Sequence, residues 1–148
     1  MGFSNMSGMV EKLNQHAPPS IVTLGGSIES FDQESGIIEF RFEARETMTH
    51  SGGIVQGGFV AGMLDAAMAH VVFCVLDKLV ILGTLEMKVS YLDIVRPGTL
   101  RATGHILRMG KSVAFLEAEI YSEKRKLLAK GSSTVRIIDR LPPGLHQS

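Results

Sequence analysis

One stretch of twenty residues constrains the fold of this chain more than any other. Residues 57–76, GGFVAGMLDAAMAHVVFCVL, are nearly all apolar or small and include no Lys or Arg. As a helix this stretch would be about 30 Å long, which is enough to cross a membrane. Asp65, near its centre, would be costly inside a bilayer. Because the rest of the chain has strand-like patterns, we expect instead a core helix wrapped by a sheet.

The segments on either side of this helix predict strands and one further helix. Apolar residues at helical spacing predict a helix over 4–16, stopped by Pro18 and Pro19. Turn residues at 32–36 separate two β-favouring runs and indicate a hairpin. The connections after the helix are too short for parallel crossovers, which favours an antiparallel meander. The expected strands cover 21–31, 36–44, 84–91, 100–108, 113–121 and 127–138.

Alternation is clearest in residues 84–91, where it assigns side chains to two faces. Met87, Val89 and Tyr91 would point one way together with Leu85, and Thr84 would point the other way. The order of elements is helix, two strands, long helix and four strands. This order predicts an α+β fold, with a long central helix against a curled antiparallel sheet of about six strands.

Length and composition limit the class of protein. A chain of 148 residues reads as one domain, 1–148, with an N-terminal helical segment at 1–18 and a flexible tail at 140–148. Fifteen basic and fifteen acidic residues leave no net charge, which argues against a nucleic-acid partner. A single cysteine, Cys74, excludes a disulfide framework and any multi-cysteine zinc site, and we expect it to be an inert core residue. The N-terminus has no signal-peptide pattern, so we expect a cytoplasmic protein.

Asp65 is the first candidate for chemistry. A carboxylate buried among small apolar residues costs several kcal/mol unless it is paired or hydrogen-bonded, and its own helix offers no cation. Three interpretations follow: a partner from elsewhere in the fold, a solvent-facing position, or a pocket in which Asp65 acts as a base or nucleophile.

Gly57 and Gly58 open the long helix and form the second candidate. Gln56 before them is not a favoured N-cap residue, so the first N–H groups could be left for a ligand oxygen. The alternative is a weakly capped helix whose glycines serve the turn. His50 and Gln56 flank the glycine-containing loop before this helix, and either could hydrogen-bond a carbonyl. The remaining histidines show no metal-ligand spacing, so no metal site is expected.

Together these features resemble a known family. The segment 50–58, HSGGIVQGG, followed by Asp65, resembles the hotdog-fold acyl-CoA thioesterases, and most closely the phenylacetate-pathway (PaaI-type) subfamily. The resemblance covers roughly residues 49–138. It continues after the helix through Thr84, Tyr91, Pro97, Gly98 and the Gly110-Lys111-Ser112 hairpin.

The resemblance implies a function and roles for individual residues. The Gly57 N–H would polarise the thioester carbonyl, and Asp65 of the partner subunit would activate water or attack the thioester. Thr84 would hold that water or the carboxylate. Family members are dimers or tetramers with sites at the subunit interface, and they need no cofactor beyond the coenzyme A of the substrate.

Further residues follow from the same resemblance. Gly58 would let the substrate come close, and Arg108 and Lys111 would meet the phosphates of coenzyme A. The family has Asn at the position of His50 and His at the position of Gln56, so this chain departs from the pattern at both. Either residue could still donate to a carbonyl. These departures keep two alternatives open: a non-catalytic acyl-CoA or acyl-chain binding protein of the same fold, and a hotdog hydratase or dehydratase.

Overall fold

A computed structural model describes residues 8–138, and the expected tail at 140–148 lies outside that range. The described chain is one long helix on a six-stranded antiparallel sheet, with short helices before and between the strands. The elements are α1 (Gly8–Gln15), α2 (Pro19–Thr23), β1 (Gly26–Asp32), β2 (Ile37–Ala44), the 3-10 turns η2 (Glu46–Met48) and η3 (Ser51–Gly53), α3 (Gly57–Leu76), β3 (Ile81–Tyr91), β4 (Gly98–Met109), β5 (Val113–Ser122) and β6 (Leu127–Ile138).

The N-terminal part differs from the prediction at one point. The expected helix is present as α1 within the described residues, but residues 19–23 form a second helix, α2, where a strand was expected to begin. Pro19 occupies the first helical position, where its missing N–H costs nothing and its fixed φ favours a helix. The hairpin that follows is confirmed, since β1 and β2 pair antiparallel.

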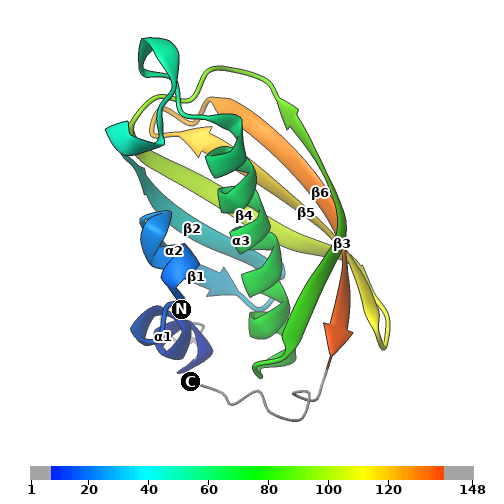
Figure 1. Cartoon of the computed structure of the whole chain (residues 1–148). Coiled ribbons are helices and arrows are strands. Elements are labelled where there is room, and N and C mark those ends of the chain that lie inside the picture. The colour runs from blue at the N-terminus through cyan, green and yellow to red at the C-terminus, as the bar shows by residue number, and fades with distance from the viewer. Residues whose placement is uncertain (1–7, 139–148) are drawn as a thin grey trace.

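The order of strands corrects the expected meander. All pairs are antiparallel, but the order across the sheet is β1-β2-β4-β5-β6-β3. β3 therefore lies at one edge, beside β6, and the chain crosses the end of the sheet before it enters β4 (Figure 1). Sequence proximity suggested that β3 and β4 would pair. Connection length alone excludes parallel crossovers but does not determine which antiparallel neighbour a strand takes.

The long helix has the predicted bounds and packs on the concave face of the sheet (Figure 1). Ten of its twenty residues are buried, and they meet the inward side chains of β2, β4, β5 and β6 in one core. The apolar character that suggested a membrane span therefore serves contacts within the fold. Asp77 ends the helix in a left-handed conformation, and its backbone N–H donates to the Phe73 carbonyl.

The helix and the sheet approach each other closely at Gly104 of β4. A Cβ atom on Gly104 would lie 2.7 Å from the Ala67 carbonyl oxygen, which belongs to the helix backbone. A glycine is therefore required at this crossing, and it sets the distance between α3 and the sheet. Gly83 of β3 offers a contrast, because a Cβ there would meet nothing within 4 Å.

These two positions give a stability prediction. Gly104→Ala should lower the free energy of unfolding by about 2–3 kcal/mol, because the helix backbone must shift to admit the methyl group. Gly83→Ala should leave stability unchanged or raise it slightly, since it only restricts the unfolded chain. Urea unfolding followed by circular dichroism measures both, and equal effects at the two positions would refute this account of the crossing.

Candidate active site

Asp65 lies half-buried in the middle of α3 and has one side-chain partner. Thr84 Oγ1 on β3 donates to Asp65 Oδ1 at 3.1 Å. Within residues 8–138 no Lys, Arg or His forms an ion pair with Asp65, and Oδ2 accepts no hydrogen bond from the protein. The carboxylate is thus held by a hydroxyl group from elsewhere in the fold and is still partly open to solvent.

A β-bulge in β3 makes the contact between Thr84 and Asp65 possible. Thr84 pairs with Val135 and Glu86 pairs with Thr134, so Leu85 is an extra residue between the two pairs. Leu85 is 60% exposed, and Thr84 shares the helix-facing side with Met87 beyond the bulge. The predicted alternation placed Leu85 on the same face as Met87 and Thr84 on the opposite face, and for these two residues it is wrong. No sequence signal marked this bulge.

Gln56 caps the start of α3, contrary to expectation. Its side-chain Oε1 accepts from the Gly58 N–H at 2.9 Å, so the second N–H of the helix is satisfied. The Gly57 N–H has no acceptor within the described residues. A Gln at this position is long enough to fold back on the first turn, although shorter side chains are the common N-caps. One donor thus stays free for a ligand.

Tyr91 is a site residue to which sequence analysis assigned no role. Its hydroxyl donates to the Gly57 carbonyl at 2.8 Å, and a Cβ on Gly57 would lie 3.2 Å from its ring. A Cβ on Gly58 would lie 2.8 Å from Gln56 Oε1. Neither glycine has a positive φ, so the interpretation that they serve a turn is wrong. Each glycine makes room for a neighbouring polar group. Tyr91 was one of the residues that carried the family resemblance, so the sequence could have pointed to it as a site residue.

An open hollow of about 490 Å³ lies beside the free Gly57 N–H. Its lining comes from the loop before α3, the start of α3 and the connection from β3 to β4, and it is mostly apolar. The lining residues are Ile54, Val55, Gly57, Val60 and 91–95.

His50 lies in the loop before α3 and does not contact Asp65. An isolated bridge between Thr49 and Val55 closes this loop, and the His50 N–H donates to the Ile54 carbonyl at 2.9 Å. The exposed imidazole Nδ1 is 3.3 Å from Ser51 Oγ. Within one chain, the structure therefore brings together Asp65 with Thr84, and Gly57 with Gly58, Gln56 and Tyr91, and leaves His50 apart.

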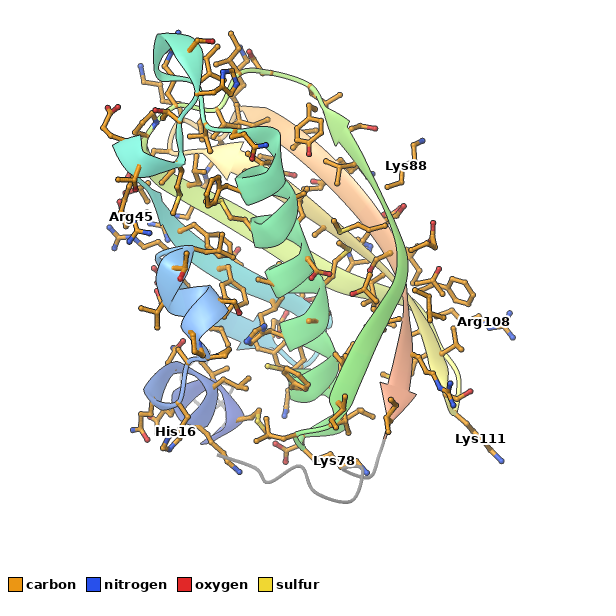
Figure 2. All side chains as sticks on the ribbon, in the orientation of Figure 1. His16, Arg45, Lys78, Lys88, Arg108 and Lys111 are labelled. Carbon is orange, nitrogen blue, oxygen red and sulfur yellow. The ribbon has the colours of Figure 1, made fainter. Side chains whose placement is uncertain are left out.

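Arg108 and Lys111 lie far from Gly57 in the same chain. They belong to the β4–β5 hairpin, which projects beyond the C-terminal end of α3, whereas Gly57 begins the other end (Figure 2). Lys111 borders a hollow of about 260 Å³ there, together with Lys78 and Leu76. Contact between these two cations and coenzyme A would require the substrate to extend to this end of the molecule.

His70 and Cys74 belong to the core. His70 is buried, its Nδ1–H donates to the Ala66 carbonyl at 2.8 Å, and its ring edge packs against Phe40 and Phe73. Burial lowers the pKa of His70, although the Ala66 hydrogen bond and the Asp65 charge oppose this effect. Burial raises the pKa of the Cys74 thiol to about 12, as expected for an inert core residue. Within residues 8–138 no three His, Cys, Asp or Glu side chains are placed to hold a metal.

Comparison with known proteins decides the family. The profile of the thioesterase superfamily matches residues 52–129, more than half of the chain. The chain belongs to this superfamily. The matched region contains the Gly57 helix start, Asp65, Thr84 and Tyr91, so the features described above lie within the superfamily domain.

Individual relatives of this thioesterase agree with the assignment. The medium/long-chain acyl-CoA thioesterase YigI of Escherichia coli is 26% identical over 129 residues, covering 77% of this chain and 82% of the relative. A phenylacetic acid degradation-related protein from Ralstonia eutropha superposes with a TM-score of 0.78 at 28% identity, covering 87% of this chain and 99% of the other.

A more distant structure shares the fold. The PaaI protein of Escherichia coli superposes with a TM-score of 0.77 at 20% identity, over 90% of this chain and 96% of the other. The resemblance to PaaI-type hotdog thioesterases is therefore confirmed, as are the expected fold class and a thioester hydrolase.

His70 gives a pH prediction for this fold. Its folded pKa is lowered, so below about pH 6.5, its ordinary value, the unfolded chain binds a proton that the folded chain does not. The free energy of unfolding should fall as the pH drops through this range. In His70→Gln the slope should be smaller than in wild type. Imidazole titration by NMR checks the cause directly, and a His70 ring that titrates at or above its ordinary pKa of 6.5 would contradict it.

Proposed function

We propose that this thioesterase hydrolyses the thioester of an acyl-CoA to a free acid and coenzyme A. The observation that carries the proposal is Asp65, a half-buried carboxylate in an apolar helix, held by Thr84 Oγ1 at 3.1 Å with one oxygen free. A carboxylate in this state can accept a proton from water. Coenzyme A as the leaving group is supported by the name of YigI and by a Streptococcus pneumoniae thioesterase of the same fold solved with coenzyme A.

The proposed site needs two copies of the chain. Gly57 and Asp65 are eight residues apart on one helix, which is about 12 Å along its axis. A donor and a base acting on one carbonyl must each lie about 3 Å from the reacting atoms. One chain therefore cannot supply both groups to one thioester. A dimer can, if the Gly57 N–H of one subunit faces Asp65 of the other.

The β3 edge is the surface we propose for this dimer. Within residues 8–138, β3 pairs with β6 on one side, and its other side is free over eleven residues. Such an edge is a template for pairing with another strand. Antiparallel pairing of two β3 strands about a two-fold axis would also run their α3 helices in opposite directions. The start of one helix would then lie toward the middle of the other. A tetramer could form from two such dimers.

The proposed reaction uses water as the second substrate. The thioester carbonyl oxygen accepts from the Gly57 N–H, with the Gln56 amide as a further donor. Asp65 removes a proton from water, and the water oxygen bonds to the carbonyl carbon to form a tetrahedral oxyanion. The oxyanion collapses, the C–S bond breaks, and the proton passes from Asp65 to the thiolate. A free acid and a thiol result, and no cofactor is consumed. The nucleophilic alternative starts with attack by Asp65 itself.

The geometry bears differently on the two alternatives, a hydratase or dehydratase and a non-catalytic acyl-CoA binding protein. A hydratase needs a histidine beside its acid. Within one chain His50 lies apart from Asp65 in its loop, and the His70 Nδ1–H donates to the Ala66 carbonyl, so this role would need His50 of the partner subunit. The non-catalytic acyl-CoA binding protein is the second candidate, because His50 stands where the resemblance places an Asn.

Turnover of acyl-CoAs tests the proposed function. The wild type should release free thiol from at least one member of a panel of short, medium, long and aromatic acyl-CoAs. Asp65→Asn should reduce kcat by about 10²- to 10⁴-fold, because the base is lost. Asp77→Asn, at the other end of the same helix, should keep wild-type turnover, since Asn also adopts the left-handed conformation. Cys74, buried with a pKa of about 12, will not react with the thiol reagent.

The controls separate the outcomes of this assay. Equal rates for wild type and Asp65→Asn would remove Asp65 from the mechanism. If both proteins are inactive but bind acyl-CoA in calorimetry, the protein is a binding protein.

Mixing two inactive variants tests the shared site. Gly57→Pro removes the free N–H at the first helical position. The fixed φ of Pro suits that position, and the Tyr91 ring must move by a few tenths of an ångström to admit it. Asp65→Asn removes the carboxylate. After subunit exchange, half of the dimers carry one of each chain, and each of these has one intact site. The mixture should recover about a quarter of wild-type turnover. No recovery, in a mixture shown by mass spectrometry to contain mixed dimers, would place both groups in sites within one chain.

A further inference from the structure

Two polar side chains hold the two ends of one peptide group at the start of α3. The Tyr91 hydroxyl donates to the Gly57 carbonyl at 2.8 Å, and Gln56 Oε1 accepts from the Gly58 N–H at 2.9 Å. That carbonyl and that N–H belong to the same planar unit. Hydrogen bonds at both ends therefore fix the orientation of its plane. We call these two contacts the peptide clamp.

The sequence around the clamp is fitted to it. A Cβ on Gly57 would lie 3.2 Å from both Cζ and the hydroxyl oxygen of Tyr91. A Cβ on Gly58 would lie 2.8 Å from Gln56 Oε1. The two glycines thus admit the two clamping groups, one each. They also leave the start of the helix flexible in the absence of the clamp, because glycine has the largest conformational freedom.

The clamp acts on the group next to it. The Gly57 N–H belongs to the preceding peptide unit and has no acceptor within the described residues, and Gly57 lines the open hollow together with Tyr91. Its direction depends on the dihedral angles of Gly57, which the clamp restrains. A donor that stabilises an oxyanion is effective only if it is oriented before the reaction.

We propose that Tyr91 is a positioning residue, which through the peptide clamp with Gln56 keeps the Gly57 N–H aimed at the thioester carbonyl. This role rests on the proposed function, in which that N–H stabilises the oxyanion. β3 then has two roles, because this strand donates one hydrogen bond from Thr84 to Asp65 and another from Tyr91 to the Gly57 carbonyl. The pairing edge and both polar contacts to the helix then belong to one strand.

The two tyrosines of the chain give a matched test. Tyr91→Phe removes the hydroxyl and keeps the ring against Gly57, whereas Tyr121→Phe removes a hydroxyl on β5 that donates to Glu119. Tyr91→Phe should lower kcat about 3- to 10-fold, the value of one hydrogen bond, with KM within about twofold of wild type. Tyr121→Phe should match wild type in both. A merely structural role for Tyr91 would lower the melting temperature without this separation of kcat from KM.

Amide hydrogen exchange provides a readout that does not depend on turnover. In Tyr91→Phe the Gly58 N–H should exchange faster than in wild type and in Tyr121→Phe, because the peptide group is released at one end. If wild type turns over acyl-CoA and Tyr91→Phe has the kcat of Tyr121→Phe, the positioning role is wrong. Unchanged exchange at Gly58 would show that the clamp itself is wrong. An inactive wild type with faster exchange in Tyr91→Phe would instead refute the proposed function and leave the clamp as a structural feature.

Discussion

The contact between α3 and β4 is the constraint on which the rest of the structure depends. At Gly104 the helix backbone approaches the sheet so closely that a single methyl group would have to displace it. Because the interior is close-packed, the helix can neither slide nor roll without losing contacts along its buried face. The positions of Gly57 at its start and Asp65 at its middle follow from this one crossing. The polar groups at both positions are therefore presented by a rigid element rather than by a loop.

A hydrogen bond from β3 lowers the free-energy cost of placing the Asp65 carboxylate in this apolar helix. An unpaired carboxylate there would lose several kcal/mol of hydration. Asp65 avoids most of this cost because its side of the helix is half-exposed and Thr84 donates to it. A cation in the same place would neutralise the carboxylate and weaken it as a base. The Thr84 hydroxyl fixes the orientation of the Asp65 carboxylate and does not neutralise its charge. A carboxylate that must accept a proton from water needs both.

The sequence was sufficient for the elements and insufficient for the contacts between them. The bounds of α3 follow from an unbroken apolar run, and the positions of β4, β5 and β6 follow from strand-like runs between turn residues. The edge position of β3 and the bulge at Leu85 depend on long-range pairing, which leaves no local pattern. The same limit applies to the site. Asp65 stood out as a charge in an apolar run, whereas the cap by Gln56 and the contact of Tyr91 needed the fold to be seen.

The departures from the family pattern can be understood from this geometry. Gln56 stands where the resemblance places a histidine at the helix start. Its uncharged side chain both caps Gly58 and keeps an amide N–H₂ group free within the described chain. A histidine could cap the helix only through a deprotonated ring nitrogen, so its cap would weaken at low pH. Gln56 keeps the same donor and acceptor at every pH. In the proposed mechanism the two donors of the oxyanion site, the Gly57 N–H and the Gln56 amide, therefore stay donors over the whole range in which a histidine would change its charge.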